Sequence, residues 1–178
     1  CCATIPIRSR GDGLLPVPGW SGDYEWQGYV PFENRPQLIN PAQGYIGTAN
    51  NKVAAENYPH FISHYWEPSD RIRRIHQLLN TPGKLSVEDV KQMQQDIFSG
   101  LASELTPQIV QALEKESADA GFQKVRQILS GWDFKMEKDS VAAGLFEMTF
   151  MHMLENIFKD ELGPELFEQY LKTSVFPP

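Results

Sequence analysis

The spacing of apolar residues changes along the chain, and this change predicts two parts of different structure. From Pro68 onward, apolar residues recur every three or four positions, the period of a helix that buries one face. Before that point the apolar runs are short, and residues 1–59 hold seven of the thirteen prolines and seven of the thirteen glycines. The sequence therefore predicts a strand and loop segment over residues 1–66 and a helical segment over residues 67–178.

Six stretches of the second part carry the helical pattern. They cover residues 70–79, 87–101, 107–113, 121–132, 140–157 and 163–172. Side chains that can cap a helix precede four of them: Ser69 or Asp70, Ser86, Thr106 and Asp139. Asp89 follows Ser86 at capping-box spacing, and Pro107 follows Thr106 in the order favoured at a helix start.

The first part is predicted to form one edge of a larger sheet. The runs ATIPIR (3–8) and YIGTAN (45–50) have the composition of short strands. Proline keeps most of the sequence between them out of a central sheet, and loops of this length are usually functional or packed against another element. The predicted fold class is therefore α+β, with loops and a few short strands first and helices afterwards.

Composition and charge narrow the range of partners. The formal net charge is −7, and Arg71, Arg73 and Arg74 form the only compact basic cluster, so a nucleic-acid partner is not expected. No apolar stretch approaches the roughly 20 residues needed to cross a bilayer, so no membrane partner is expected either. The chain begins at Cys1 without a methionine and shows no signal peptide, which indicates a processed or excised chain.

Three candidates could carry chemistry, but a simpler interpretation is favoured for each. Cys1 could be a nucleophile activated by its own α-amino group, although a cut in a longer chain can fall before any residue. His152 lies in a run rich in methionine and phenylalanine, which predicts a buried helix with a core histidine. His60 and His64 would share a face of a helix, but no carboxylate accompanies them, so no metal site is predicted.

Two adjacent carboxamides, Asn50 and Asn51, end the second predicted strand. Neighbouring residues of a strand point to opposite faces, so one amide could face a site while the other holds the backbone. On the residues alone, the favoured interpretation is that the pair simply ends the strand, because asparagine tolerates left-handed backbone.

Three segments in a fixed order carry a resemblance to a known family. They are IPIRSRGDGLLPVPGW, WQGYVPFENRPQLINPAQGYIGTANNKV and YPHFISHYWEPSDRIRRIHQLL. In order and spacing they resemble the penicillin acylases, a group of N-terminal-nucleophile hydrolases that includes penicillin G, cephalosporin and acyl-homoserine-lactone acylases. The helical remainder is also similar to the part that follows in that family, so the resemblance covers nearly the whole chain.

The resemblance implies roles for two residues. Asn50 matches the asparagine whose side-chain amide donates to the oxyanion hole, where a fixed N–H stabilises the negative charge that builds up during amide hydrolysis. Arg71, in the SDRI motif, matches the arginine that orients this asparagine and the nucleophile's α-amino group and helps keep the amine unprotonated. Asn51 would then point elsewhere and hold the loop.

The resemblance also implies that parts of the enzyme lie outside this chain. The family's nucleophile stands well upstream of the IPIR segment, so Cys1 does not match it. The chain is therefore expected to be an internal fragment of the large subunit, inactive alone, that joins the rest of that subunit and the small subunit in the periplasm or outside the cell. The complete enzyme would hydrolyse a linear amide, such as the acyl side chain of a β-lactam or an acyl-homoserine lactone, through an acyl-enzyme.

No cofactor is expected, although the family's structural calcium is possible in the complete enzyme. One calcium ligand of the family is a backbone oxygen that would fall near Gly13, while the aspartate ligand expected near FISHYW has no counterpart. Asp12 alone does not make a calcium site.

A different class remains open as the alternative. A non-catalytic helical binding module, whose loop-rich N-terminal arm docks on a partner, accounts equally well for the helices and the acidic charge. It gives no reason for Asn50 and Arg71 to occur in one motif order with the proline-rich loop.

Overall fold

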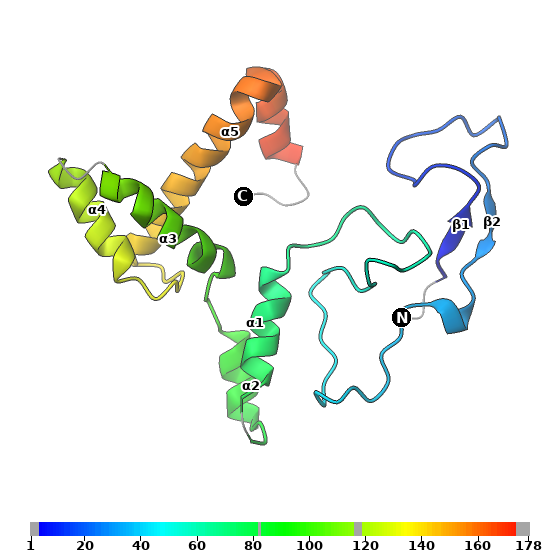
Figure 1. Cartoon of the computed structure of the whole chain (residues 1–178), viewed down its shortest axis with the longest axis horizontal. Helices are drawn as coiled ribbons and strands as arrows, with labels where there is room; N and C mark the ends of the chain where they lie inside the picture. Colours follow the sequence, from blue (N-terminus) through cyan, green and yellow to red (C-terminus); the bar gives the residue numbers. More distant parts are fainter. Residues whose placement is uncertain (1–3, 82, 116–118, 174–178) are drawn as a thin grey trace. The chain divides into compact units, whose positions relative to one another are not determined.

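The computed structural model describes residues 4–81, 83–115 and 119–173. The chain divides into two compact units, Cys1–Lys84 and Leu85–Pro178, and each is described by itself. Strands occur in the first unit, while the second is built from helices (Figure 1). The α+β class predicted from the sequence is confirmed.

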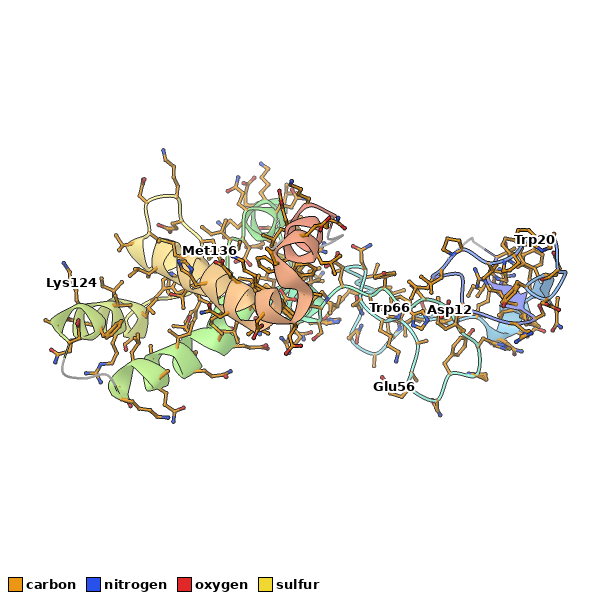
Figure 2. All side chains as sticks on the ribbon, turned by 90° about the horizontal axis from the view of Figure 1, so that it is seen from above. Asp12, Trp20, Glu56, Trp66, Lys124 and Met136 are labelled. Atoms are coloured by element: carbon orange, nitrogen blue, oxygen red, sulfur yellow. The ribbon has the colours of Figure 1, made fainter. Side chains whose placement is uncertain are left out.

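The first unit opens with two short antiparallel strands. Strand β1 spans Pro6–Arg8 and pairs with β2, which spans Trp26–Tyr29 (Figure 1). Trp20 lies in the loop that joins the two strands, and its side chain is 90% exposed (Figure 2). A short 3-10 helix, η1, follows at Phe32–Asn34. The first predicted strand is thus present, and the unit buries few apolar side chains, among them Val30 and Ile72.

The second predicted strand, over residues 45–50, is wrong. No residue of this run joins a strand ladder in the described part of the chain, and Asn50 adopts left-handed backbone with φ 61°. A strand needs a neighbour that pairs with its backbone, and this segment packs instead against the helix α1, Asp70–Leu79. That helix begins where predicted, although the Ser69 side chain makes no capping hydrogen bond.

The second unit begins with a helix that is shorter than predicted. Helix α2 spans Val87–Gln94, and both hydrogen bonds of the predicted capping box between Ser86 and Asp89 are present. It stops before Leu101 because the chain at 97–99 pairs with 134–136: Met136 N–H donates to the Ile97 carbonyl, and Ser99 N–H donates to the Phe134 carbonyl. A backbone held in that pairing cannot continue a helix.

The next helix starts earlier than predicted. Helix α3 spans Gly100–Lys115 and therefore contains Pro107, which was expected at its start. The Ser99 hydroxyl accepts a hydrogen bond from Ala102 N–H and supplies the start signal. An early start also lets Ala102 lie fully buried in the core. Burial and capping therefore outweigh the cost of proline inside a helix, roughly 3 kcal/mol.

Two further helices complete the second unit. Helix α4 spans Ala120–Ser130 and is capped by Asp119, and α5 spans Val141–Thr173. Ser140 rather than the predicted Asp139 caps α5, because its hydroxyl accepts from Ala143 N–H at 3.2 Å. Helix α5 breaks at Gly163, whose φ of 73° lies outside the helical range, so the separate last helix predicted after this residue is present.

The core of the second unit lies where α3, α4 and the first turns of α5 meet. Its buried members are Ala102, Leu129, Trp132, Ala142, Ala143 and Phe146. Beyond these turns α5 is more open: Met148 and Ile157 are exposed, and the His152 side chain is 73% exposed, with Nδ1 3.9 Å from the Glu155 carboxylate. The prediction of a wholly buried helix with a core histidine was therefore wrong, because α3 and α4 cover only the start of α5.

Candidate functional site

The segment that carries Asn50 is fastened to α1 at three successive points. At its start, the Tyr45 hydroxyl lies 2.7 Å from His76 Nδ1 and donates to Asn80 Oδ1 at 3.1 Å. In its middle, Gly47 packs on Ile72 and Ile75. At its end, the Asn50 carbonyl accepts a hydrogen bond from the N–H of Glu67, shortly before the helix begins at Asp70. The segment therefore runs antiparallel to α1 along its length.

Gly47 lies against the helix in the middle of this contact. A side-chain carbon at this position would lie 3.5 Å from Ile72 Cδ1 and 3.5 Å from Ile75 Cγ2. At the far end, the Glu67 N–H donates to the Asn50 carbonyl at 2.9 Å. These contacts join residues 17 to 35 positions apart, so the backbone at Asn50 is fixed by tertiary structure.

Asn50 itself occupies a turn that suits an exposed donor. Its φ of 61° lies in the left-handed region, which asparagine adopts more readily than most residues. Its side chain is exposed, and its amide has no hydrogen-bond partner among the residues that the structure describes. Asn51 does the opposite: its Oδ1 accepts from Ala49 N–H at 3.0 Å, and its Nδ2 donates to the Lys52 carbonyl at 3.1 Å. Among the described residues, the Asn50 amide is thus unpaired, whereas the Asn51 amide ties the loop.

Arg71 lies in the first turn of α1 and is linked to Asn50 through Glu67. Its Nη1 is 3.7 Å from Glu67 Oε2, and its side chain is 55% exposed whereas that of Glu67 is 22% exposed. The sequence analysis missed Glu67. The spacing of Glu67 and Arg71 gave no clear signal, because pairs four positions apart meet on a helix and Glu67 precedes the first residue of α1, Asp70.

The contact between Tyr45 and α1 yields a direct test of how this turn is held. Replacing Tyr45 by Phe removes the hydroxyl that meets His76 and Asn80, and one such hydrogen bond contributes about 0.5–1.5 kcal/mol. We expect the amide of Glu67, which is bonded to Asn50, to exchange its hydrogen about 3- to 10-fold faster. Hydrogen exchange followed by NMR measures this directly.

A matched control comes from Tyr58, whose hydroxyl donates to the Asn34 carbonyl in another part of the same unit. Tyr58→Phe should leave the exchange of the Glu67 amide unchanged. Equal exchange rates in Tyr45→Phe and the unaltered chain would show that Tyr45 does not hold the turn.

Two loops of the first unit meet at a second polar contact. Asp12 Oδ2 lies 2.5 Å from His64 Nε2, and Asp12 Oδ1 accepts from Leu14 N–H at 2.9 Å. The Leu14 N–H, followed by His64, lowers the pKa of the Asp12 carboxyl below its usual value. The side chains line an open hollow of about 230 Å³. His60 and His64 lie in a loop and therefore do not share a helical face.

The same hollow can be compared with the ligand set that calcium needs. Calcium takes six to eight oxygen ligands, and this hollow offers one carboxylate, Asp12, which is already bonded to His64 and Leu14. Across residues 4–81, 83–115 and 119–173, no group of three His, Cys, Asp or Glu side chains could hold a metal ion. These residues do not fit a calcium site, and a calcium of the complete enzyme would need ligands from elsewhere.

Two other expectations concern membrane crossing and the first residue of the chain. Within its described ranges, none of the helices combines the length and the apolar character needed to cross a membrane. Cys1, considered above as a nucleophile, lies outside the described residues.

The comparison with known proteins identifies the class of this chain. Residues 2–177 match the family described as penicillin amidase. The chain therefore belongs to the penicillin amidase family.

Individual relatives are acylases of two named kinds. The chain is 35% identical over 144 residues to penicillin acylase 2 proenzyme of Pseudomonas sp. (strain SE83), covering 81% of this chain and 18% of that protein. It is 35% identical over 173 residues to acyl-homoserine lactone acylase QuiP of Pseudomonas fluorescens (strain Pf0-1), covering 90% of this chain and 21% of that protein. It is 37% identical over 86 residues to penicillin G acylase of Escherichia coli, covering 47% and 10%. The chain thus spans 18% and 21% of the length of the first two relatives.

Proposed function

We propose that this chain is an internal segment of the large subunit of a penicillin-acylase-type N-terminal-nucleophile amidohydrolase. Support comes from the family match over residues 2–177 and from the small share of each relative that the chain spans. In this proposal residues 1–66 supply strands and loops to the enzyme's central sheet, and residues 67–178 supply a helical segment. The partners are the rest of the large subunit and the small subunit, and the location is periplasmic or extracellular.

The reaction is hydrolysis of a linear amide in two steps. A nucleophile outside this chain attacks the carbonyl carbon, and the carbonyl oxygen takes up negative charge. Collapse of this intermediate breaks the C–N bond, the protonated amine leaves, and an acyl-enzyme remains. Water then attacks the acyl-enzyme, releases the carboxylic acid and restores the nucleophile.

Asn50 is the residue of this chain that contributes most directly. Its side-chain amide would donate a hydrogen bond to the oxyanion in both steps, and a carboxamide suits this role because it donates without titrating. The observation that carries the proposal is the turn at Asn50. The Glu67 N–H bonds its carbonyl and the Asn51 side chain bonds the flanking Ala49 and Lys52, while the Asn50 amide stays exposed and unpaired among the described residues. A donor carried on a fixed backbone needs less reorganisation when charge develops.

Arg71 would act on the nucleophile's amine. A positive guanidinium near an amine disfavours its protonated form, and a neutral amine can accept the nucleophile's proton. At the start of α1 a cation opposes the helix dipole, and the Glu67 carboxylate, 3.7 Å from Arg71, offsets that cost. The support for this role is therefore the match of Arg71 to the SDRI motif.

Activity assays on two proteins test the proposal. The purified 178-residue chain should hydrolyse neither a phenylacetyl anilide nor a fatty-acyl anilide, whereas the full-length protein that contains it should release the chromogenic amine. Turnover by the short chain that disappears in Cys1→Ser would overturn the proposal and favour Cys1 as the nucleophile. A full-length protein without amidase activity on any acyl anilide would favour the alternative, a helical binding module.

A further inference from the structure

Glu67 contacts both residues that the proposed function places at the site. Its backbone N–H donates to the Asn50 carbonyl at 2.9 Å, and its carboxylate lies 3.7 Å from the Arg71 guanidinium. Its side chain is 22% exposed, so water screens this charge less than it would screen a freely exposed carboxylate. A single residue therefore joins the turn that holds the amide donor to the helix that carries the cation.

The carboxylate of Glu67 has an electrostatic consequence for Arg71. A negative charge beside the guanidinium offsets part of its field, so any amine near Arg71 experiences a smaller positive potential. Other charged groups lie on the same helix and on the loop that follows Asn51. Asp70, Arg73 and Arg74 lie on the same helix, and Lys52 and Glu56, which pair with each other at 2.8 Å, lie on the loop after Asn51.

We propose that Glu67 is a positioning residue that holds Arg71 beside the Asn50 turn and sets the strength of the positive field at the catalytic amine. This inference rests on the proposed function, because the amine belongs to the nucleophile of the complete enzyme. In this role Glu67 influences the pH range over which the enzyme is active, without contacting the substrate. The backbone contact to Asn50 ties the residue that carries this charge to the turn that carries the proposed oxyanion donor.

The sign of the effect follows from the charges. Arg71 disfavours the protonated amine, and Glu67 opposes Arg71. Removing the charge of Glu67 therefore disfavours the protonated amine further, and the amine stays neutral down to a lower pH. Removing the charge of Arg71 has the opposite effect. A change that only loosened the loop would lower the rate at all pH values and leave the profile in place.

The experiment is the pH profile of kcat/KM for the full-length enzyme and its variants. In Glu67→Gln we expect the acidic limb to move to lower pH by about 0.3–1 unit, whereas Arg71→Gln should move it to higher pH. Glu67→Asp keeps the charge and should restore the limb to its original position. Melting temperatures of the variants identify any that fold poorly, and Glu67→Asp keeps the inference testable if Glu67→Gln is one of them.

The matched control is Glu56→Gln, which changes the net charge by the same amount. Glu56 is exposed and pairs with Lys52, so its removal should leave the acidic limb in place. An acidic limb that is the same in Glu67→Gln and the unaltered enzyme overturns the inference, as does an equal shift in Glu56→Gln. In either case the wild-type amidase activity still stands, so failure of this inference is distinguishable from failure of the proposed function, which would appear as no turnover at all.

Discussion

In the full-length enzyme, Asn50→Gly should lower kcat about 10²–10³-fold with little change in KM. The substitution removes the amide that would donate to the oxyanion, and such a donor contributes mainly when negative charge has developed. Glycine is the suitable replacement because Asn50 has a φ of 61°, which glycine adopts without strain. The melting temperature should therefore change little.

Two further variants separate catalysis from stability at this turn. Asn50→Ala should lose the same activity and, because alanine is strained in left-handed backbone, lose about 1–2 kcal/mol of stability as well. Asn51→Ala should instead act through stability alone, about 1–2 kcal/mol, since its amide bonds the backbone of Ala49 and Lys52. Steady-state kinetics and thermal melts of all three variants are the measurement. An inactive, stable Asn51→Ala beside an active Asn50→Gly would show that the wrong asparagine has been assigned.

Local signals predicted most of the helices correctly. The capping box at Ser86 and Asp89 is present, and the break at Gly163 separates the last helix as expected. These features depend on residues a few positions apart, and so they are visible in the sequence. The errors fall where distant residues compete with a local signal. Pro107 favours a helix start, but burial of Ala102 in the core moves that start to Gly100.

The site shows the same division between local and distant information. Asn50 and Arg71 were proposed as site residues through a motif, since their order along the chain is a property of the sequence. Glu67 was not, because its contact with Asn50 is a backbone hydrogen bond to a residue 17 positions earlier. The prediction of a strand at residues 45–50 was wrong for a related reason. The apolar pattern indicates that the segment packs on another element, and a helix face can cover its apolar side chains as well as a sheet can.

The largest effect on stability is expected in the second unit, from Phe146→Ala. Phe146 is 1% exposed, its ring stacks on Phe150 at 6.1 Å between centroids, and it meets Trp132 at 5.7 Å. Truncating a buried phenylalanine removes its apolar contacts and leaves a cavity, which typically costs 3 to 5 kcal/mol, or about 4 kcal/mol here. Denaturant unfolding of the 178-residue chain, followed by far-UV circular dichroism, should show an early transition of the helical unit.

Met148, two positions later on the same helix, gives the matched control. Its side chain is 64% exposed, so Met148→Ala should change the unfolding free energy by no more than about 0.5 kcal/mol. The contrast tests whether the core ends at the first turns of α5. If Met148→Ala destabilised the chain as much as Phe146→Ala, α5 would have to be buried on the face that carries Met148, and the original expectation of a wholly buried helix would be restored. A small effect of Met148→Ala beside a large one of Phe146→Ala would instead place the stabilising contacts of α5 where α3 and α4 cover it.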